Sequence, residues 1–296
     1  MQNKQAYLVI AHNNFNILNK QLKLLDDERN DFYIHVDIKA GDFDKALILD
    51  GVEKSKVTFI PRISVLWGDY SQVQVEYNLL KYAENSGVGY KYYHLLSGVD
   101  LPIKHKNTIF DFFDKSNKIY ICCMSSKTTY QRERTKYYYP FINCKKFRTS
   151  KILKGLSRYL GKAQKFIGIN RHKNKKNYEV CYCGWQWFSI PNEFAKHVIA
   201  MEKKVYSTFK KTLAPDESFI QTIAMNSEFQ SMISKLNSTE EASMRRIDWK
   251  RTGGRTPYTF TIADYDDLMA CPYMFARKFD EKVDMEIVDK IYQTIK

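Results

Sequence analysis

The acidic residues of this chain suggest two kinds of chemistry, metal binding and proton transfer. Asp42–Asp44 and Asp264–Asp266 each place two carboxylates two residues apart, a spacing that can hold a divalent metal against a phosphate group. The first pair lies in a polar loop opened by Gly41, and the second begins a predicted helix, where Asp is a good cap. We therefore expect neither pair to bind a metal.

A third acidic pair, Asp216 and Glu217, follows Pro215 at the start of a predicted helix. Acids in the first turn of a helix are favoured by the helix dipole, which gives the pair an ordinary structural interpretation. A carboxylate at such a position can also act as a general base toward an attacking hydroxyl. Taken alone, the local sequence favours the structural interpretation.

Several common catalytic and cofactor-binding motifs are absent from the sequence. It contains neither GxGxxG nor GxxxxGK[ST], which excludes the usual dinucleotide and P-loop cradles. It also lacks HExxH and the GxSxG nucleophile elbow. No CxxC occurs among the six cysteines, and Cys181 and Cys183 have no second ligand pair at zinc spacing, so we expect reduced thiols.

The positive charge is concentrated in one segment. The chain has 47 Lys and Arg against 33 Asp and Glu, a formal net charge of +14. Residues 145–176 contain twelve of these cations and no acid, which leaves +2 for the rest of the chain. Between Ser150 and Gly168, apolar residues recur every three or four positions, which predicts a basic amphipathic helix.

Three interpretations of this basic segment remain open. A basic amphipathic helix is typical of proteins that rest on anionic membranes. It can equally be a surface helix whose apolar stripe packs on the core. A nucleic-acid-binding surface is the third possibility, although no zinc-finger, RNA-recognition or helix-turn-helix signature accompanies the charge.

The first third of the chain alternates strands and helices, which predicts a parallel α/β sheet. Short apolar runs predict the strands Ala6–Ile10, Phe32–Val36, Val57–Ile60 and Tyr92–Leu96, and helical spacing predicts the helices Phe15–Asp27, Tyr70–Ala83 and Thr108–Asp114. Ligands bind at the carboxyl ends of such strands. His12, Asp37 and the run Ser97–Asp100 all fall at those ends.

The second half is less regular, and no change in composition marks a linker. We expect strands at Lys118–Cys123, Tyr182–Ile190 and Thr259–Thr261, and helices at Asn192–Lys203, Pro215–Met225 and Asp264–Ala270. Hydrophobic residues make up 44% of the chain, enough to bury a core. We predict one compact domain over residues 1–296.

No apolar stretch approaches the roughly 20 residues that a membrane span requires. The run Ala6–Ile10 is too short for the apolar region of a signal peptide. We therefore expect a cytoplasmic protein, with peripheral contact to the inner face of the plasma membrane through its basic segment.

Seven blocks of the sequence, in the same order, resemble the core-2/I-branching β-1,6-N-acetylglucosaminyltransferase family, which includes the peptide xylosyltransferases. The two longest blocks are LWGDYSQV at 66–73 and HLLSGVDLPIK at 94–104. The others are YIHVD at 33–37, GWQWFSI at 184–190, PDE at 215–217, IDW at 247–249 and FARKFD at 275–280. Together they span nearly the whole chain.

This resemblance implies a GT-A-like α/β fold with a Rossmann-like mixed central sheet flanked by helices and without a functional DxD motif. It further implies an inverting transfer from a UDP-sugar without a metal or other cofactor. Residues 1–115 would form the nucleotide-binding half, and residues 116–296 the acceptor-binding and catalytic half. Glu217 matches the catalytic base of the family, and this match outweighs the dipole interpretation.

The resemblance also implies the residues that bind donor and acceptor. Arg277 and Lys278 match the diphosphate-binding element, and Arg255 falls near a second phosphate cation, for which Arg251 competes. The remaining donor residues are His12, Asp37, Trp67, Ser71 and Asp100. The acceptor residues are Arg132, Arg134, Trp185, Gln186 and Trp187. Core packing for Trp67 and the aromatic strand, and capping for Ser71, are the structural alternatives.

From these observations we predict transfer of N-acetylglucosamine from a UDP-sugar to a glycan acceptor in cell-surface polysaccharide synthesis. UDP-xylose is the alternative donor. The predicted partners are the UDP-sugar, a glycan or lipid-linked glycan acceptor and an anionic membrane surface, without nucleic acid. A nucleic-acid-binding protein and an inactive sugar-binding relative are the competing hypotheses.

Overall fold

The computed structural model describes residues 3–125, 129–147, 149–254 and 256–296, with the side chains of 129–132 left out. Its centre is a six-stranded sheet in the order β3-β2-β1-β4-β7-β6. The strands are β1 (Gln5–Ala11), β2 (Asn30–Val36), β3 (Lys56–Phe59), β4 (Tyr92–Ser97), β6 (Tyr120–Met124) and β7 (Cys183–Pro191). The first four are mutually parallel, whereas β7 runs antiparallel to β4 and β6.

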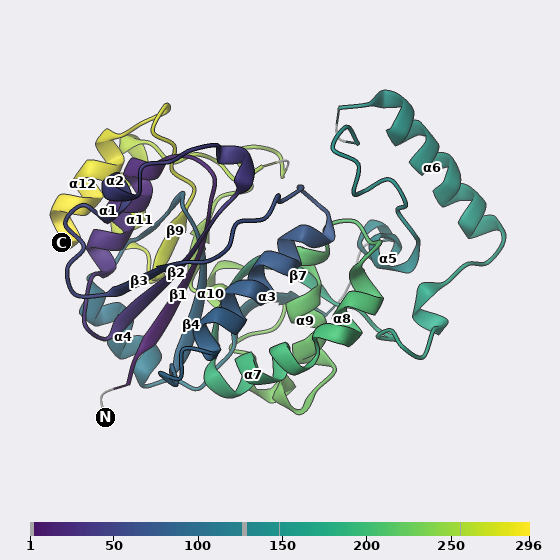
Figure 1. Cartoon of the computed structure of the whole chain (residues 1–296), viewed down its shortest axis with the longest axis horizontal. Helices are drawn as coiled ribbons and strands as arrows, with labels where there is room; N and C mark the ends of the chain where they lie inside the picture. The colour runs from purple at the N-terminus through teal and green to yellow at the C-terminus, as the bar shows by residue number, and fades with distance from the viewer. Residues whose placement is uncertain (1–2, 126–128, 148, 255) are drawn as a thin grey trace.

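Helices cover both faces of this sheet (Figure 1). One face packs against α3 (Tyr70–Glu84), α7 (Asn192–Ala200), α8 (Glu202–Phe209) and α9 (Phe219–Met225). The other packs against α1 (Phe15–Leu25), α2 (Lys45–Leu49) and α4 (Lys106–Asp114). Because both faces are covered, β1, β2 and β4 are almost entirely buried, which explains their continuous apolar runs.

A second, three-stranded sheet extends the fold at the carboxyl ends of the central strands. It has the order β5-β9-β8 and consists of β5 (Asp100–Pro102), β8 (Arg245–Ile247) and β9 (Phe275–Arg277). A cluster of buried residues joins it to α1, α11 (Tyr265–Ala270) and α12 (Glu286–Ile295). The second sheet therefore brings the C-terminal part of the chain beside the strand ends of the first.

The remaining elements are short or lie apart. They are α5 (Thr129–Lys136), α6 (Lys151–Phe166), α10 (Glu240–Ser243) and the 3-10 turns η1 (Ile38–Ala40), η2 (Arg171–Lys173), η3 (Pro215–Glu217), η4 (Glu228–Met232) and η5 (Ile262–Asp264). Helix α6 stands away from the sheets and the helices that cover them (Figure 1). Among the described residues, no helix is both long and apolar enough to cross a bilayer.

The expected class, a mixed α/β fold with a central mixed sheet flanked by helices, is confirmed, and so are the four parallel strands. Three predictions for the second half need correction. The predicted helix 192–203 is two helices, because the chain turns at Met201. The predicted helix 215–225 is a 3-10 turn followed by α9. Thr259–Thr261 forms no strand, since Thr261 caps η5 instead.

Candidate active site

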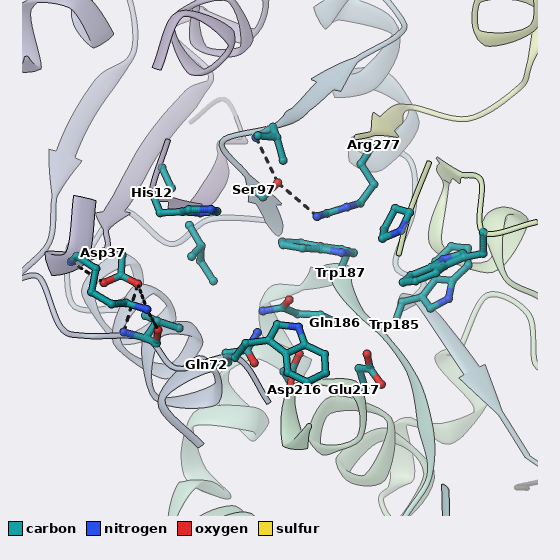
Figure 2. A pocket seen from close by; sticks show the side chains of 18 residues that line it. His12, Asp37, Gln72, Ser97, Trp185, Gln186, Trp187, Asp216, Glu217 and Arg277 are labelled. Atoms are coloured by element: carbon teal, nitrogen blue, oxygen red, sulfur yellow. Dashed lines mark hydrogen bonds and ion pairs between the residues drawn. The ribbon is translucent and has the colours of Figure 1, made fainter. Parts of the chain in front are cut away.

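A cleft of about 400 Å³ lies at the carboxyl ends of β1, β2 and β4, where the parallel-sheet rule places ligands (Figure 2). Both halves of the sequence contribute residues to its lining. The lining residues from the first half are Ile10, Ala11, His12, Asp37, Lys39, Val65, Trp67, Gln72, Ser97 and Val99. Those from the second half are Trp185, Gln186, Trp187, Asp216, Glu217, Trp249, Pro257 and Arg277.

His12 and Asp37 form one end of the cleft (Figure 2). The Asp37 carboxylate accepts from the N–H of Lys39 at 2.9 Å and lies 3.3 Å from the Lys39 ammonium. Burial lowers the pKa of His12, although Asp37 partly opposes this, so the imidazole is neutral near pH 7. His35 is instead fully buried, and its Nε2 accepts from the N–H of Ile63 at 3.0 Å, as a core histidine does.

The loop that carries Trp67 is attached to the turn that carries Glu217. Gly68 adopts a left-handed φ of 77°, and its carbonyl accepts from the N–H of Ala214 at 2.8 Å. Ser71 does not line the cleft. Its hydroxyl accepts from the N–H of Leu66 at 2.8 Å and so fixes the loop, whereas Asp69, and not Ser71, caps α3.

Strand β7 presents Trp185, Gln186 and Trp187 to the cleft (Figure 2). The preceding residue must be glycine, because a Cβ on Gly184 would lie 1.7 Å from the carbonyl oxygen of Cys122 on β6. This close approach accompanies a register shift between β6 and β7. All three side chains line the cavity, and Trp187 also packs against the buried core beside it.

Arg277 is held between an acid and an aromatic ring. Its guanidinium lies 3.2 Å from Asp100 Oδ1, donates to Ser97 Oγ at 3.3 Å and stacks 4.0 Å from the centre of the Trp187 ring. Asp100 is 2% exposed and does not line the cleft. The structure therefore places Asp100 behind Arg277, as its counter-ion, rather than against a ligand.

Glu217 faces the cleft from the opposite wall (Figure 2). Arg134 Nη2 donates to Glu217 Oε2 at 2.8 Å and to the carbonyl of Ala214 at 2.9 Å, while its Nε donates to the carbonyl of Leu213. The Arg134 side chain is 8% exposed and does not line the cleft. We expected Arg134 to contact the acceptor; the geometry instead gives it a positioning role toward Glu217.

Asp216, which lines the cleft, lies near a second carboxyl group, that of the fully buried Glu76. Burial, reinforced by the charge of Glu217, raises the pKa of Asp216 to about 7. Burial and the nearby Asp216 raise the pKa of Glu76 on α3 well above its usual range. Glu76 Oε1 accepts from Gln186 Nε2 at 2.9 Å, and the buried Oδ1 of Asp216 has no hydrogen-bond partner. Burial thus favours the protonated form of both groups, and Glu76 orients Gln186.

Two of the predicted cations, Lys278 and Arg251, do not line the cleft. Lys278 follows β9, and its main chain bonds to Tyr258 and Phe260, but its side chain is not among the lining residues. Arg251 is engaged by Asp248 and Asp264, each at 2.6 Å, and stacks on Tyr258. Arg255 and the side chain of Arg132 lie outside the described residues.

Neither pair of closely spaced aspartates lies in the cleft. Asp44 caps α2 through the N–H groups of Ala46 and Leu47. Asp264 forms a capping box with Thr261 at η5. Within the described ranges, no three His, Cys, Asp or Glu side chains are grouped closely enough to hold a metal.

Three lining residues escaped the sequence analysis. Gln72 accepts from the N–H of Gly68 and stiffens the Trp67 loop. The indole N–H of Trp249 is buried without a hydrogen-bond partner and so offers a donor for a ligand. Lys39 reaches the cleft beside Asp37. Trp249 lies in the IDW block and Gln72 in the block with Trp67, so the resemblance could have indicated both residues. Lys39 lies in none of the blocks.

Comparison with known proteins identifies the class to which this fold and cleft belong. The model of the "Core-2/I-Branching enzyme" family matches residues 5–269, and the chain therefore belongs to this family of glycosyltransferases. The resemblance inferred from the blocks is confirmed.

Two curated relatives show the range of the family. A human beta-1,3-galactosyl-O-glycosyl-glycoprotein beta-1,6-N-acetylglucosaminyltransferase is 24% identical over 95% of this chain and 67% of its own length. Rat xylosyltransferase 2 is 23% identical over 96% of this chain but 33% of its own length. The chain thus spans about two thirds of the first relative and one third of the second. A mouse xyloside xylosyltransferase 1 structure aligns over 93% of this chain and 97% of its own, with 10% identity and a TM-score of 0.39.

Proposed function

We propose that the chain is an inverting transferase that moves a sugar from UDP to a hydroxyl of a glycan acceptor without a metal. The observation that carries this proposal is the position of Glu217. Its carboxylate shares one cleft with the strand-end residues His12 and Asp37 and with the partly buried cation Arg277. A base, a nucleotide-sized strand-end site and a cation are the components that such a displacement requires.

In the proposed step, the acceptor oxygen attacks the anomeric carbon on the face opposite the UDP. The new C–O bond forms as the bond to the diphosphate oxygen breaks, and UDP leaves with the electron pair. The acceptor proton passes to Glu217, whose carboxylate is oriented by its contact with Arg134 at 2.8 Å. The configuration at the anomeric carbon is thereby inverted in a single displacement.

Charge that develops on the leaving diphosphate needs fixed donors when no metal supplies them. Arg277 and Lys39 are the cations that line the cleft among the described residues, and the indole N–H of Trp249 is an unused donor. Asp100 offsets part of the charge of Arg277, so further cations are required. Lys278 and Arg255 remain our proposals for that role.

The donor we propose first is UDP-N-acetylglucosamine, because the human and bovine relatives are N-acetylglucosaminyltransferases. UDP-xylose is the alternative, since other relatives are xylosyltransferases. We propose a glycan acceptor in cell-surface polysaccharide synthesis. Trp185 lines the cleft and bears on the choice of acceptor.

A panel of UDP-sugars tests this proposal. Thermal shift should identify one donor that stabilises the protein above UDP alone, and a UDP-release assay with that donor should show turnover in the presence of EDTA. Complete loss of turnover in EDTA would refute metal independence while leaving the transferase intact. Binding without any release of UDP, with glycan acceptors supplied, would indicate an inactive sugar-binding relative.

A further inference from the structure

Helix α6 is amphipathic, but its apolar side faces away from the protein. The exposed fractions of its apolar side chains are 81% for Ile152, 68% for Tyr159 and 92% for Phe166. Leu156 and Ile167, the residue that directly follows the helix, are also exposed. Gln164 is the one buried residue in the helix, all of which the structure describes. Packing of the apolar stripe on the core, one of the three interpretations left open by the sequence, is therefore wrong.

Polar contacts attach the helix to the rest of the chain. The Gln164 amide exchanges two hydrogen bonds with the backbone of Tyr138, at 2.8 and 3.0 Å. Lys165 forms an ion pair with Glu133 on α5 at 3.1 Å. The helix is thus held by its polar side, and its apolar side remains available. An exposed apolar stripe of this kind is costly in water and marks an interaction surface.

The charge around α6 restricts what can cover that stripe. Residues 145–176 carry twelve cations and no acid. A second copy of the chain would bring the same positive segment against this one, so like charges would oppose a symmetric dimer through α6. A nucleic acid would neutralise the cations but leave the apolar side chains in water. An anionic bilayer satisfies both features, because acyl chains accept the stripe and headgroups accept the cations.

We propose that α6 docks the protein on an anionic lipid surface, lying in the plane of the interface with Ile152, Tyr159 and Phe166 inserted among the lipids. Because the helix stands away from the main body (Figure 1), a bilayer has room to approach it. This docking is independent of the proposed reaction, since it requires neither UDP nor an acceptor.

The docked orientation would place the catalytic cleft near the membrane. Between α6 and the body lies a second cavity of about 760 Å³, lined on the helix side by Lys154, Arg158 and Lys162. Trp67 lines both this cavity and the cleft that contains Glu217. The two cavities therefore share a wall at Trp67, and an anionic acceptor group held beside Lys154, Arg158 and Lys162 would lie next to the cleft.

Sedimentation of the full chain with vesicles tests the docking. We expect the protein to bind vesicles of phosphatidylglycerol and phosphatidylcholine in equal parts, to bind pure phosphatidylcholine weakly, and to lose affinity as salt rises. The key variant is I152S/Y159S/F166S. Because these side chains are exposed and line neither cavity, it should fold as the parent does and release UDP at the same rate, yet lose at least about tenfold in vesicle affinity.

Two further variants separate apolar insertion from charge. K151Q/K154Q/K162Q should also weaken binding to anionic vesicles and flatten its salt dependence. The matched control is V88S/V283S, which removes exposed apolar side chains elsewhere and should bind vesicles as the parent does.

The proposal is overturned if the parent does not bind anionic vesicles, or if I152S/Y159S/F166S binds them as the parent does. It is also overturned if the parent is a dimer in analytical ultracentrifugation and that variant a monomer, because a second copy then covers the stripe. Failure of the UDP-sugar panel would leave the vesicle result unaffected, so the two proposals fail separately.

Discussion

The candidate active-site cleft and α6 use the same residue types in opposite ways. In the cleft, Arg277 is 13% exposed at its side chain and is fixed by Asp100, Ser97 and the Trp187 ring. On α6, five cations and the apolar stripe project into solvent. Lys165 is the one cation on this helix for which an acidic partner is found in the described part of the chain.

This difference separates two kinds of binding. A cation fixed before the ligand arrives costs no reorganisation when charge develops, which suits a reacting site. Exposed cations beside exposed apolar groups cannot select one small ligand, but they suit a broad anionic surface. The net charge of +14 therefore describes α6 and its flanks, and it says little about the chemistry of the cleft.

Removing Arg277 should have the largest effect on stability. Arg277→Ala leaves Asp100 buried without its counter-ion, and we expect a loss of about 3–5 kcal/mol in the free energy of unfolding. Arg277→Lys keeps the charge and should lose less, although it cannot stack on Trp187 in the same way. Urea denaturation of both variants measures this. Equal stability of Arg277→Ala and the parent would show that the pair is not structural.

Removing Arg134 should affect turnover more than donor binding. Arg134→Ala releases the 213–217 turn and the Glu217 carboxylate, and we expect kcat to fall about 10- to 100-fold. The dissociation constant for UDP should change little, because Arg134 does not line the cleft. Arg134→Lys should restore part of kcat. Loss of UDP affinity with unchanged kcat would contradict the positioning role.

The buried Asp216 makes stability depend on pH. Its pKa of about 7 in the folded protein lies above the ordinary value of 3.8, so the folded state binds the proton more tightly than the unfolded chain does. Stability should therefore fall as pH rises from about 4 to about 7. Asp216→Asn removes this dependence, and above pH 7 it should be more stable than the parent by up to about 4 kcal/mol.

Chemical denaturation across this pH range checks the prediction, with the exposed Asp266→Asn as the control. Parallel stability curves for Asp216→Asn and the parent would show that Asp216 keeps its charge throughout.

The smallest effect on stability is expected on α6. Phe166→Ala removes a side chain that is 92% exposed, and the free energy of unfolding should change by less than about 0.5 kcal/mol. Phe188→Ala, on the buried face of β7, should cost about 3–5 kcal/mol. Similar losses from the two substitutions would mean that α6 packs on the protein after all.

Much of the fold was predictable because its signals are local. The apolar runs of β1, β2 and β4 indicate strands buried on both faces, and His12, Asp37 and Ser97 follow directly from where those strands end. The blocks placed Glu217 and the aromatic strand in the same site. The break at Met201 and the loss of the predicted strand 259–261 were not predictable, since tertiary packing decides them.

The electrostatics of the site could not be predicted from the sequence. Arg134 and Glu217 are 83 residues apart, and no local pattern pairs them. The raised pKa of Asp216 depends on burial and on Glu217, and only the fold establishes that burial. The helical period of α6 was predictable, whereas the direction of its apolar side was not, because periodicity shows that a stripe exists and not what it faces.

Glu217→Gln gives the most direct test of the proposed chemistry. The amide keeps the shape of the side chain but cannot accept the acceptor proton. With the donor selected by the UDP-sugar panel, we predict that transfer falls at least about 100-fold while the dissociation constant for UDP stays within about threefold. Glu193→Gln, an exposed change on α7, is the matched control and should behave as the parent does. Transfer by Glu217→Gln at the parent rate would contradict the account.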